Sequence, residues 1–266
     1  MSNPKALILR APGINCERET HHAFERAGGT SEYLHIKKLL EQPDQLDQFQ
    51  ILAVPGGFSY GDDISSGRVL AQEMKAQLGE RILNFVDRGG LVVGICNGFQ
   101  VLVRLGLLPC TKGTLEEEVT LTHNLSNHYE CRWVTVKTQK SRCSFLPEGL
   151  TLRWPAAHGE GRLVATSPAA QQTLVDEGFA AVVYVDQNGK ATEQYPANPN
   201  GAPLGIAGLT NHNGRVLGVM PHPDRSYLPI HMPNWRRTQL ENGELPLDGD
   251  GMVVFREMVK AAKAEA

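Results

Sequence analysis

A cysteine with a glycine two residues away on each side is the strongest chemical signal in the sequence. Gly94, Cys96 and Gly98 form the pattern Gly-x-Cys-x-Gly at the end of an apolar run that begins at Leu91. This is the thiol counterpart of the Gly-x-Ser-x-Gly nucleophile elbow, a sharp turn between a strand and a helix that exposes the nucleophile. Glycines beside such a turn leave no Cβ to clash with strained backbone or with a substrate. The pattern predicts that Cys96 is a nucleophile.

A helix is expected to begin at Cys96, because residues 100–105 are mostly apolar and follow the elbow directly. The positive end of the helix dipole would favour a thiolate over a thiol in its first turn. Two alternatives stay open. A free cysteine is often a buried structural residue after a core strand. Cys16 is a second candidate nucleophile, since it follows the first predicted strand, although no pair of glycines flanks it.

Two histidines are each followed, two positions later, by a carboxylate. His222 leaves a predicted strand and precedes Asp224, which could orient the imidazole so that it acts as a base. Cys96, His222 and Asp224 would then form a Cys-His-acid triad. The chain has 9 histidines, so His222 taken alone is more typical of an ordinary loop histidine. His158 and Glu160 form the second pair, for which a polar loop is the alternative.

A glycine-rich loop at residues 55–63 follows the third predicted strand. Its glycines suit a phosphate cradle or an oxyanion-binding loop, but no Gly-Lys-Ser/Thr follows, which argues against a P-loop. The loop supplies free backbone N–H groups at the carboxyl end of a strand, where open α/β sheets bind ligands. The alternative is a tight turn that needs glycine for its backbone conformation.

The elements that must position these residues alternate between strands and helices. The predicted strands are short apolar runs at residues 6–9, 31–35, 51–54 and 91–95, and helices at residues 17–27 and 69–88 lie among them. This order predicts a doubly wound, mostly parallel α/β sheet with Cys96 near its carboxyl edge. After residue 117, short alternating segments predict added antiparallel strands, including a hairpin with its turn at residues 211–214. We expect one domain over residues 1–266, with a surface excursion at residues 228–250 and a final helix at 251–263.

Composition restricts the class of protein. A hydrophobic content of 41%, a charged content of 21% and a net charge of −3 are ordinary for a globular chain, and they favour neither nucleic acid nor a membrane as partner. The N-terminus lacks a signal-peptide apolar core, and no apolar run approaches the roughly 20 residues of a membrane helix, so a cytoplasmic location is expected. The 5 cysteines contain no Cys-x-x-Cys, which argues against a disulfide framework and a metal site.

Seven segments together resemble the glutaminase component of phosphoribosylformylglycinamidine synthase, a class I, triad-type glutamine amidotransferase of purine biosynthesis. The segments are PGINCE at 12–17, PGGFSYGD at 55–62, GICNGFQ at 94–100, LLP at 107–109, AHGEGR at 157–162, YPANPNG at 195–201 and MPHPDR at 220–225. The elbow and the His-Pro-acid segment indicate the superfamily, and the second, fifth and sixth segments narrow it to this synthase. The resemblance implies a flavodoxin-like, doubly wound sheet with added antiparallel strands.

The resemblance also implies a role for each site residue. Cys96 would attack the side-chain amide of glutamine, and His222 would take the thiol proton and return it to the departing ammonia. The backbone N–H groups of Gly57 and Asn97 would stabilise the oxyanion, at about 3 kcal/mol per donor. The residues that the resemblance places around bound glutamine are Gly56, Phe58 and Gln100. His158 and Glu160 are candidates for the active site or for the face toward the synthetase.

One residue departs from the family pattern. The third triad member is usually Glu in this family, and the chain has Asp224 in that place. The side chain of Asp is shorter by about one C–C bond. Asp224 therefore either lies closer to His222 or orients it less well.

The resemblance implies that the chain is one part of a larger enzyme. Ammonia would pass to a synthetase subunit, which would use ATP and magnesium, while this chain would hold no cofactor. A small third subunit is a further candidate partner. Two other functions stay open: an amidotransferase with the same triad that serves a different acceptor, and a non-catalytic flavodoxin-like protein in which Cys96 senses redox state.

Overall fold

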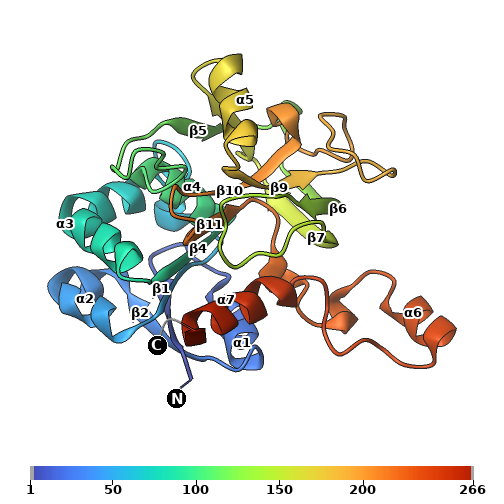
Figure 1. Cartoon of the computed structure of the whole chain (residues 1–266), viewed down its shortest axis with the longest axis horizontal. Helices are drawn as coiled ribbons and strands as arrows, with labels where there is room; N and C mark the ends of the chain where they lie inside the picture. The colour runs from blue at the N-terminus through green and yellow to red at the C-terminus, as the bar shows by residue number, and fades with distance from the viewer. Residues whose placement is uncertain (1–2, 265–266) are drawn as a thin grey trace.

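The computed structural model describes residues 3–264, so the two residues at each end of the expected domain lie outside the described part. Its largest element is a nine-stranded sheet in the order β2-β1-β3-β4-β11-β10-β9-β6-β7 (Figure 1). Five strands are parallel: β1 (Lys5–Arg10), β2 (Thr30–His35), β3 (Ile51–Val54), β4 (Leu91–Ile95) and β11 (Val216–Val219). This is the strand order of flavodoxin-like folds. The predicted doubly wound sheet is therefore confirmed.

The second half of the sheet is antiparallel, and the strand direction changes at β11. It contains β10 (Ile206–Thr210), β9 (Ala180–Tyr184), β6 (Glu130–Thr138) and β7 (Thr151–His158). A separate two-stranded sheet pairs β5 (Val119–Thr122) with β8 (Arg162–Ala165). The predicted hairpin is β10 and β11, and its turn is closed by Asn211, whose Oδ1 accepts hydrogen bonds from the backbone N–H groups of Arg215 and Val216.

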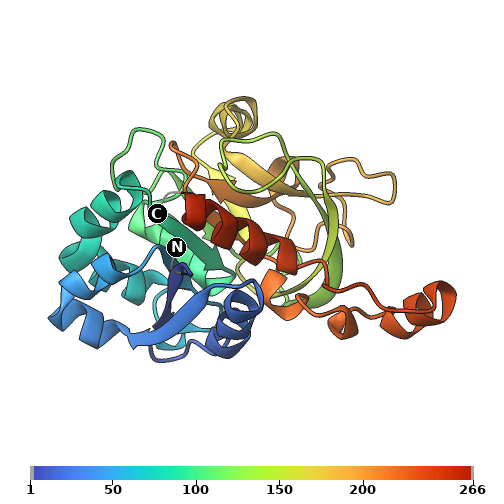
Figure 2. The same cartoon turned by 60° about the horizontal axis from the view of Figure 1, so that its bottom comes forward.

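Helices connect and cover the strands. They are α1 (Glu17–Arg26), α2 (Ile36–Glu41), α3 (Arg68–Asp87), α4 (Asn97–Leu105), α5 (Pro168–Asp176), α6 (Trp235–Asn242) and α7 (Met252–Ala264). The short 3-10 helices are η1 (Pro43–Gln48), η2 (Ser59–Asp62), η3 (Pro203–Gly205), η4 (Pro223–Arg225) and η5 (Pro229–His231). Helices α1 and α7 lie side by side (Figure 2), where the rings of Phe24 and Phe255 meet edge to face at 5.0 Å. Within residues 3–264, every helix is too short or too polar to cross a membrane.

The central strands are buried along their whole length, which is why they read as continuous apolar runs. Every residue of β3, β4 and β11 is buried. Helices therefore cover both faces, as parallel sheets require. The carboxyl ends of these three neighbouring strands lie at one edge, and the loops that leave them carry the glycine-rich segment, Cys96 and His222. The topology thus brings the candidate site together.

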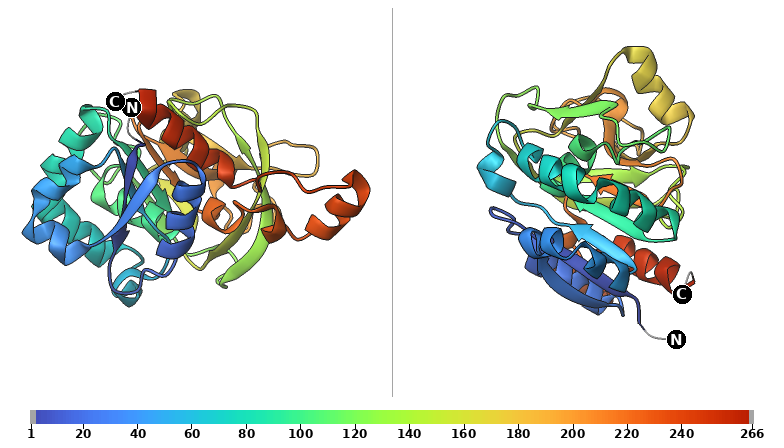
Figure 3. Two further views of the ribbon diagram at one scale, coloured as in Figure 1. Left: turned by 90° about the horizontal axis from the view of Figure 1, so that it is seen from below. Right: turned by 90° about the vertical axis from the view of Figure 1, so that its left-hand side faces the viewer.

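The segment expected to be a surface excursion forms an arm. Residues 229–247, with η5 and α6, extend away from the rest of the chain (Figures 1 and 3). Its apolar side chains Ile230, Leu240 and Leu247 are 55%, 78% and 74% exposed. Beyond the arm, Asp248 accepts two hydrogen bonds from Arg256 of α7 and pairs with Arg26 of α1, which ties the returning chain to the helical layer.

Candidate active site

The elbow at Cys96 is formed as the sequence indicates. Cys96 lies between β4 and α4 with φ of 53° and ψ of −106°, a conformation that a residue with a Cβ adopts only at a cost of about 1–3 kcal/mol. A Cβ on Gly94 would lie 2.6 Å from the carbonyl oxygen of Gly98, and a Cβ on Gly98 would collide with that of Val54. Both glycines are therefore needed for β4, the turn and α4 to pack this closely.

His222 and Asp224 form the hydrogen-bonded pair that a triad needs. His222 Nδ1 lies 3.1 Å from Asp224 Oδ1, and both side chains are buried. Burial disfavours the charged imidazole, but the negative charges of Asp224 and Cys96 and hydrogen bonds to Asp224 and Cys16 outweigh it. Together they raise the pKa of His222 well above its usual value. His222 is therefore held as a proton carrier next to a carboxylate.

Two adjacent strands bring the thiol and the imidazole to the same place. Ile95 at the end of β4 is paired with Val219 at the end of β11, and Cys96 N donates to Val219 O at 2.8 Å. Strand β7 contacts both residues. The carbonyl of Pro155 accepts from His222 N at 2.7 Å, and the carbonyl of Ala157 accepts from Cys96 Sγ at 3.5 Å. Neither contact with β7 is visible in the spacing of the sequence.

The glycine-rich loop is fastened to the elbow. Phe58 N donates to Gly13 O at 2.8 Å, and Ser59 N donates to the side-chain oxygen of Asn97 at 3.0 Å. Gly57 has φ of +147°, and a Cβ there would lie 2.6 Å from the carbonyl oxygen of Gly13. The loop is therefore joined directly to the start of α4. This suits the predicted oxyanion hole at Gly57 and Asn97, which remains a prediction.

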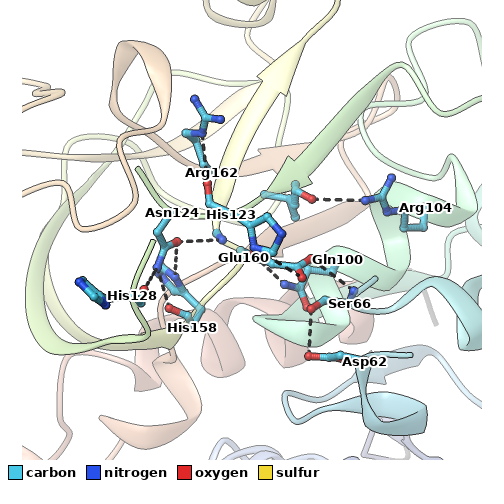
Figure 4. Close-up of polar contacts among 12 residues, drawn as sticks. Asp62, Ser66, Gln100, Arg104, His123, Asn124, His128, His158, Glu160 and Arg162 are labelled. Atoms are coloured by element: carbon cyan, nitrogen blue, oxygen red, sulfur yellow. Dashed lines mark hydrogen bonds and ion pairs between the residues drawn. The ribbon is translucent and has the colours of Figure 1, made fainter. Parts of the chain in front are cut away.

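Gln100 is held by protein groups on both sides of its amide. Its Oε1 accepts from Asn97 Nδ2 at 3.0 Å, and its Nε2 donates to the backbone oxygen of Glu160 at 2.6 Å. The carboxylate of Glu160 accepts from Ser66 N, and the hydroxyl of Ser66 donates to Asp62 (Figure 4). Glu160 is thus linked through Gln100 to the helix that follows the elbow. This is the first of the two positions predicted for it, which are the active site and the face toward the synthetase. The Gln100 amide can donate one more hydrogen bond and accept one more, so the predicted contact with glutamine is compatible with both of these contacts.

His158 does not form a dyad with Glu160, although the two residues are close in sequence. His158 Nδ1 lies 3.2 Å from Asn124 Oδ1 (Figure 4), and its Nε2 has no hydrogen-bond partner among the described residues. Burial, with a smaller effect of the charge on His222, lowers the pKa of His158 to about 3. The ring of His158 is therefore neutral at physiological pH. It lies close enough to His222 for a positive charge on His222 to disfavour one on His158.

This buried neutral ring predicts a specific acid sensitivity. Unfolding exposes His158, which then binds a proton below its ordinary pKa of 6.5, whereas the folded protein does not until pH falls to about 3. Stability is therefore lost as pH falls through this window, by about 3 kcal/mol between pH 7 and 4.5. Urea unfolding at both pH values should show that this part of the decrease is missing in His158→Gln. An equal decrease in both proteins would contradict the assignment.

Three further residues, Cys16, Tyr129 and Arg225, lie near the triad. Arg225 Nη2 donates to Cys16 Sγ at 2.9 Å, and Tyr129 stacks on Phe58 with ring centroids 6.4 Å apart. Burial raises the pKa of Tyr129, and the negative charge of Cys96 adds to the effect. The sequence holds one weak signal for Cys16, its place after β1. Arg225 ends the MPHPDR segment, which places it beside Asp224 but does not predict its contact with Cys16, and Tyr129 carries no signal.

One cluster of atoms within residues 3–264 has the spacing of a metal site. Cys16, His222 and Asp224 each place one nitrogen, sulfur or oxygen atom within 4.8 Å of the others. These atoms already bond one another or the guanidinium of Arg225, whose positive charge opposes a bound cation. We therefore assign the cluster to the triad and not to a metal.

Comparison with known proteins agrees with this geometry. Residues 3–260 match the model of the CobB/CobQ-like glutamine amidotransferase domain. The chain is 44% identical to phosphoribosylformylglycinamidine synthase subunit PurQ of Dehalococcoides mccartyi, over 99% of each chain. It is 41% identical to the same subunit of Methanococcus maripaludis, over 88% of this chain and 87% of the relative.

A solved structure shares the fold over nearly the whole chain. The PurLQS structure from Thermotoga maritima contains a chain that superposes with a TM-score of 0.69 at 30% identity, covering 97% of this chain and 98% of that one. The chain therefore belongs to the family of CobB/CobQ-like glutamine amidotransferase domains, and these relatives confirm its predicted resemblance to the glutaminase component of phosphoribosylformylglycinamidine synthase.

Proposed function

We propose that this chain hydrolyses glutamine through a thioester on Cys96 and supplies the ammonia to a synthetase subunit that amidates formylglycinamide ribonucleotide. The observation that carries the mechanism is the strained Cys96 turn at the start of α4, beside a buried histidine bonded to Asp224. The chain is thus the glutaminase component of the synthase, as its full-length relatives are.

His222 carries one proton in each half of the reaction, first that of the Cys96 thiol and then that of water. His222 takes the thiol proton, the sulfur attacks the amide carbon of glutamine, and the proton is given to the nitrogen as the C–N bond breaks and ammonia leaves. Water then attacks the thioester, with His222 taking its proton and returning it to sulfur as glutamate is released. In both steps the oxyanion lies against the N–H groups of Gly57 and Asn97.

A partner subunit is supported by the surface around the thiol. Phe58, Ile64 and Tyr129 are 45%, 86% and 53% exposed, and Phe58 and Tyr129 stack on each other. A partner that covers these apolar groups would also keep ammonia from solvent. ATP and magnesium would bind to that synthetase subunit. The small third subunit and a cytoplasmic location remain predictions.

The test of this function is mass spectrometry after exposure to a glutamine-mimicking electrophile. Wild type, Cys96→Ala and Cys16→Ala are treated with and without glutamine, in the isolated chain and with the synthetase subunit. We expect one adduct on Cys96 that glutamine prevents and that only Cys96→Ala loses. An adduct on Cys16 would overturn the choice of nucleophile. No adduct even with the synthetase present would favour the non-catalytic alternative, and glutamine hydrolysis without amidation of the ribonucleotide would indicate another acceptor.

A further inference from the structure

The buried thiol of Cys16 lies between the two loops that carry the reaction. Cys16 precedes α1, and its backbone N–H donates to the carbonyl of Gly56 at 3.1 Å, as that of Asn15 does at 3.2 Å. Ile14 forms an isolated β-bridge with Gly57. Residues 13–16 are thus a clamp on the glycine-rich loop. These contacts fix the backbone of Cys16 in space against the loop that is proposed to hold the oxyanion.

The side chain of Cys16 points to the catalytic base. A Cβ added to Gly56 would lie 2.7 Å from His222 Cε1 and 3.2 Å from Cys16 Sγ, so the imidazole ring and the sulfur border the same small space. One polar atom of His222 and the sulfur lie within 4.8 Å of each other and of Asp224. The side of the ring that faces Gly56 therefore lies beside the sulfur of Cys16.

The polar groups around the Cys16 sulfur determine which hydrogen bonds it donates and which it accepts. Asn15 Oδ1 accepts from Cys16 Sγ at 3.2 Å, so the thiol hydrogen points to Asn15. Arg225 Nη2 donates to the sulfur at 2.9 Å. One sulfur lone pair thus faces the guanidinium N–H of Arg225. Burial raises the pKa of Cys16 despite the hydrogen bond to His222, so the residue stays a neutral thiol and a poor nucleophile.

His222 needs a second support because Asp224 holds it at one point. Only Oδ1 of Asp224 is bonded to the ring, and Oδ2 has no hydrogen-bond partner among the described residues. One bond at Nδ1 leaves the ring free to tilt about that bond. A contact from the Gly56 side limits the tilt and offers a lone pair to the ring when it carries a proton.

We propose that Cys16 is a positioning residue for His222: its sulfur holds the imidazole against Asp224 and stabilises the imidazolium, while its backbone fixes the glycine-rich loop. The inference rests on the proposed role of His222 as base. It explains why a second cysteine is buried at the site without acting as a nucleophile. The charged or titratable groups that act on His222 from its surroundings include Asp224, Cys96, Cys16, Tyr129 and, at the end of β7, His158.

The direct test measures the imidazole of His222 by NMR in the full chain labelled with ¹⁵N-histidine, with the signal assigned from its loss in His222→Asn. Removing the sulfur in Cys16→Ala takes away an acceptor that favours the charged ring. The pKa of His222 should therefore fall by about one unit. Cys16→Ser keeps a donor and acceptor and should restore most of the shift. Cys143→Ala, which removes another buried cysteine, should leave the pKa unchanged.

Kinetics with the synthetase subunit present separate positioning from folding. In Cys16→Ala we expect kcat for glutamine to fall about tenfold and KM to stay within twofold, because the sulfur does not contact substrate. Cys16→Ser should recover most of kcat. Circular dichroism and a melting curve establish that each variant is folded. If Cys16→Ala is not, Cys16→Val, which fills the space without an acceptor, takes its place and should show the same losses.

Three outcomes would overturn the inference. They are an unchanged pKa of His222 in folded Cys16→Ala, the same fall in Cys143→Ala, and a failure of Cys16→Ser to recover either kcat or the pKa. None of these depends on the nucleophile. If instead His222→Asn hydrolysed glutamine normally, the proposed function itself would fail, whatever Cys16 does to the ring.

Discussion

Replacing Cys96 with alanine is expected to lower kcat for glutamine hydrolysis by about 10⁶-fold, the loss seen when a triad loses its nucleophile. The folded structure supplies no substitute. Cys16 is the other thiol near His222, but it is fully buried and bonded to Asn15 and Arg225. The residual rate would reflect binding and the oxyanion hole alone. Ammonia release from glutamine, measured with the synthetase subunit present, checks this.

Asp224→Ala provides the comparison, because Asp224 acts only through His222. Its loss should cost about 10⁴-fold, less than the loss of Cys96, since the sulfur remains and the ring keeps its other contacts. The backbone of His222 is still held by Pro155, and the ring still meets the Cys16 clamp. Equal losses in the two variants would show that Asp224 matters more than its short side chain indicates.

The chemical residues were predictable because their signals are local. The glycines around Cys96 mark the turn by their types and spacing alone, although one of the contacts that requires them is with Val54 on β3. His222 and Asp224 are two residues apart, so their hydrogen bond depends on the η4 turn alone. Strand order followed from apolar runs with helices between them.

The contacts between segments were not predictable, since each depends on how distant loops meet. His158 and Glu160 suggested a dyad by spacing, but the fold directs one toward Asn124 and the other toward Ser66. The amide of Gln100 is satisfied by a backbone oxygen 60 residues away. Every residue type carries a backbone oxygen, so a contact of this kind cannot be predicted from the type of the residue that provides it. The Arg225 contact with Cys16 spans 209 residues and is equally invisible in the sequence.

Of the proposed substitutions, Gly98→Ala is expected to lower the free energy of unfolding most. It tests why the elbow needs two glycines. A Cβ at residue 98 would collide with the carbonyl oxygen of Val54, and it would lie 3.2 Å from that of Pro55. Both are backbone atoms of β3 and of the loop that follows it, so no side chain can move aside. The start of α4 must separate from β3, at a cost of about 3 kcal/mol, which corresponds to a fall in Tm of about 8 °C.

The same shift would move the thiol away from the oxyanion loop, so activity should fall by about 100-fold or more in the protein that remains folded. Gly79→Ala in α3 is the matched control. Its Cβ would meet only the flexible end of Leu115 at 3.0 Å, and alanine inside a helix is favoured over glycine by about 1 kcal/mol. Its Tm and activity should stay close to those of wild type. If Gly98→Ala behaved like Gly79→Ala, the close approach of α4 to β3 would not be what holds Cys96 in place.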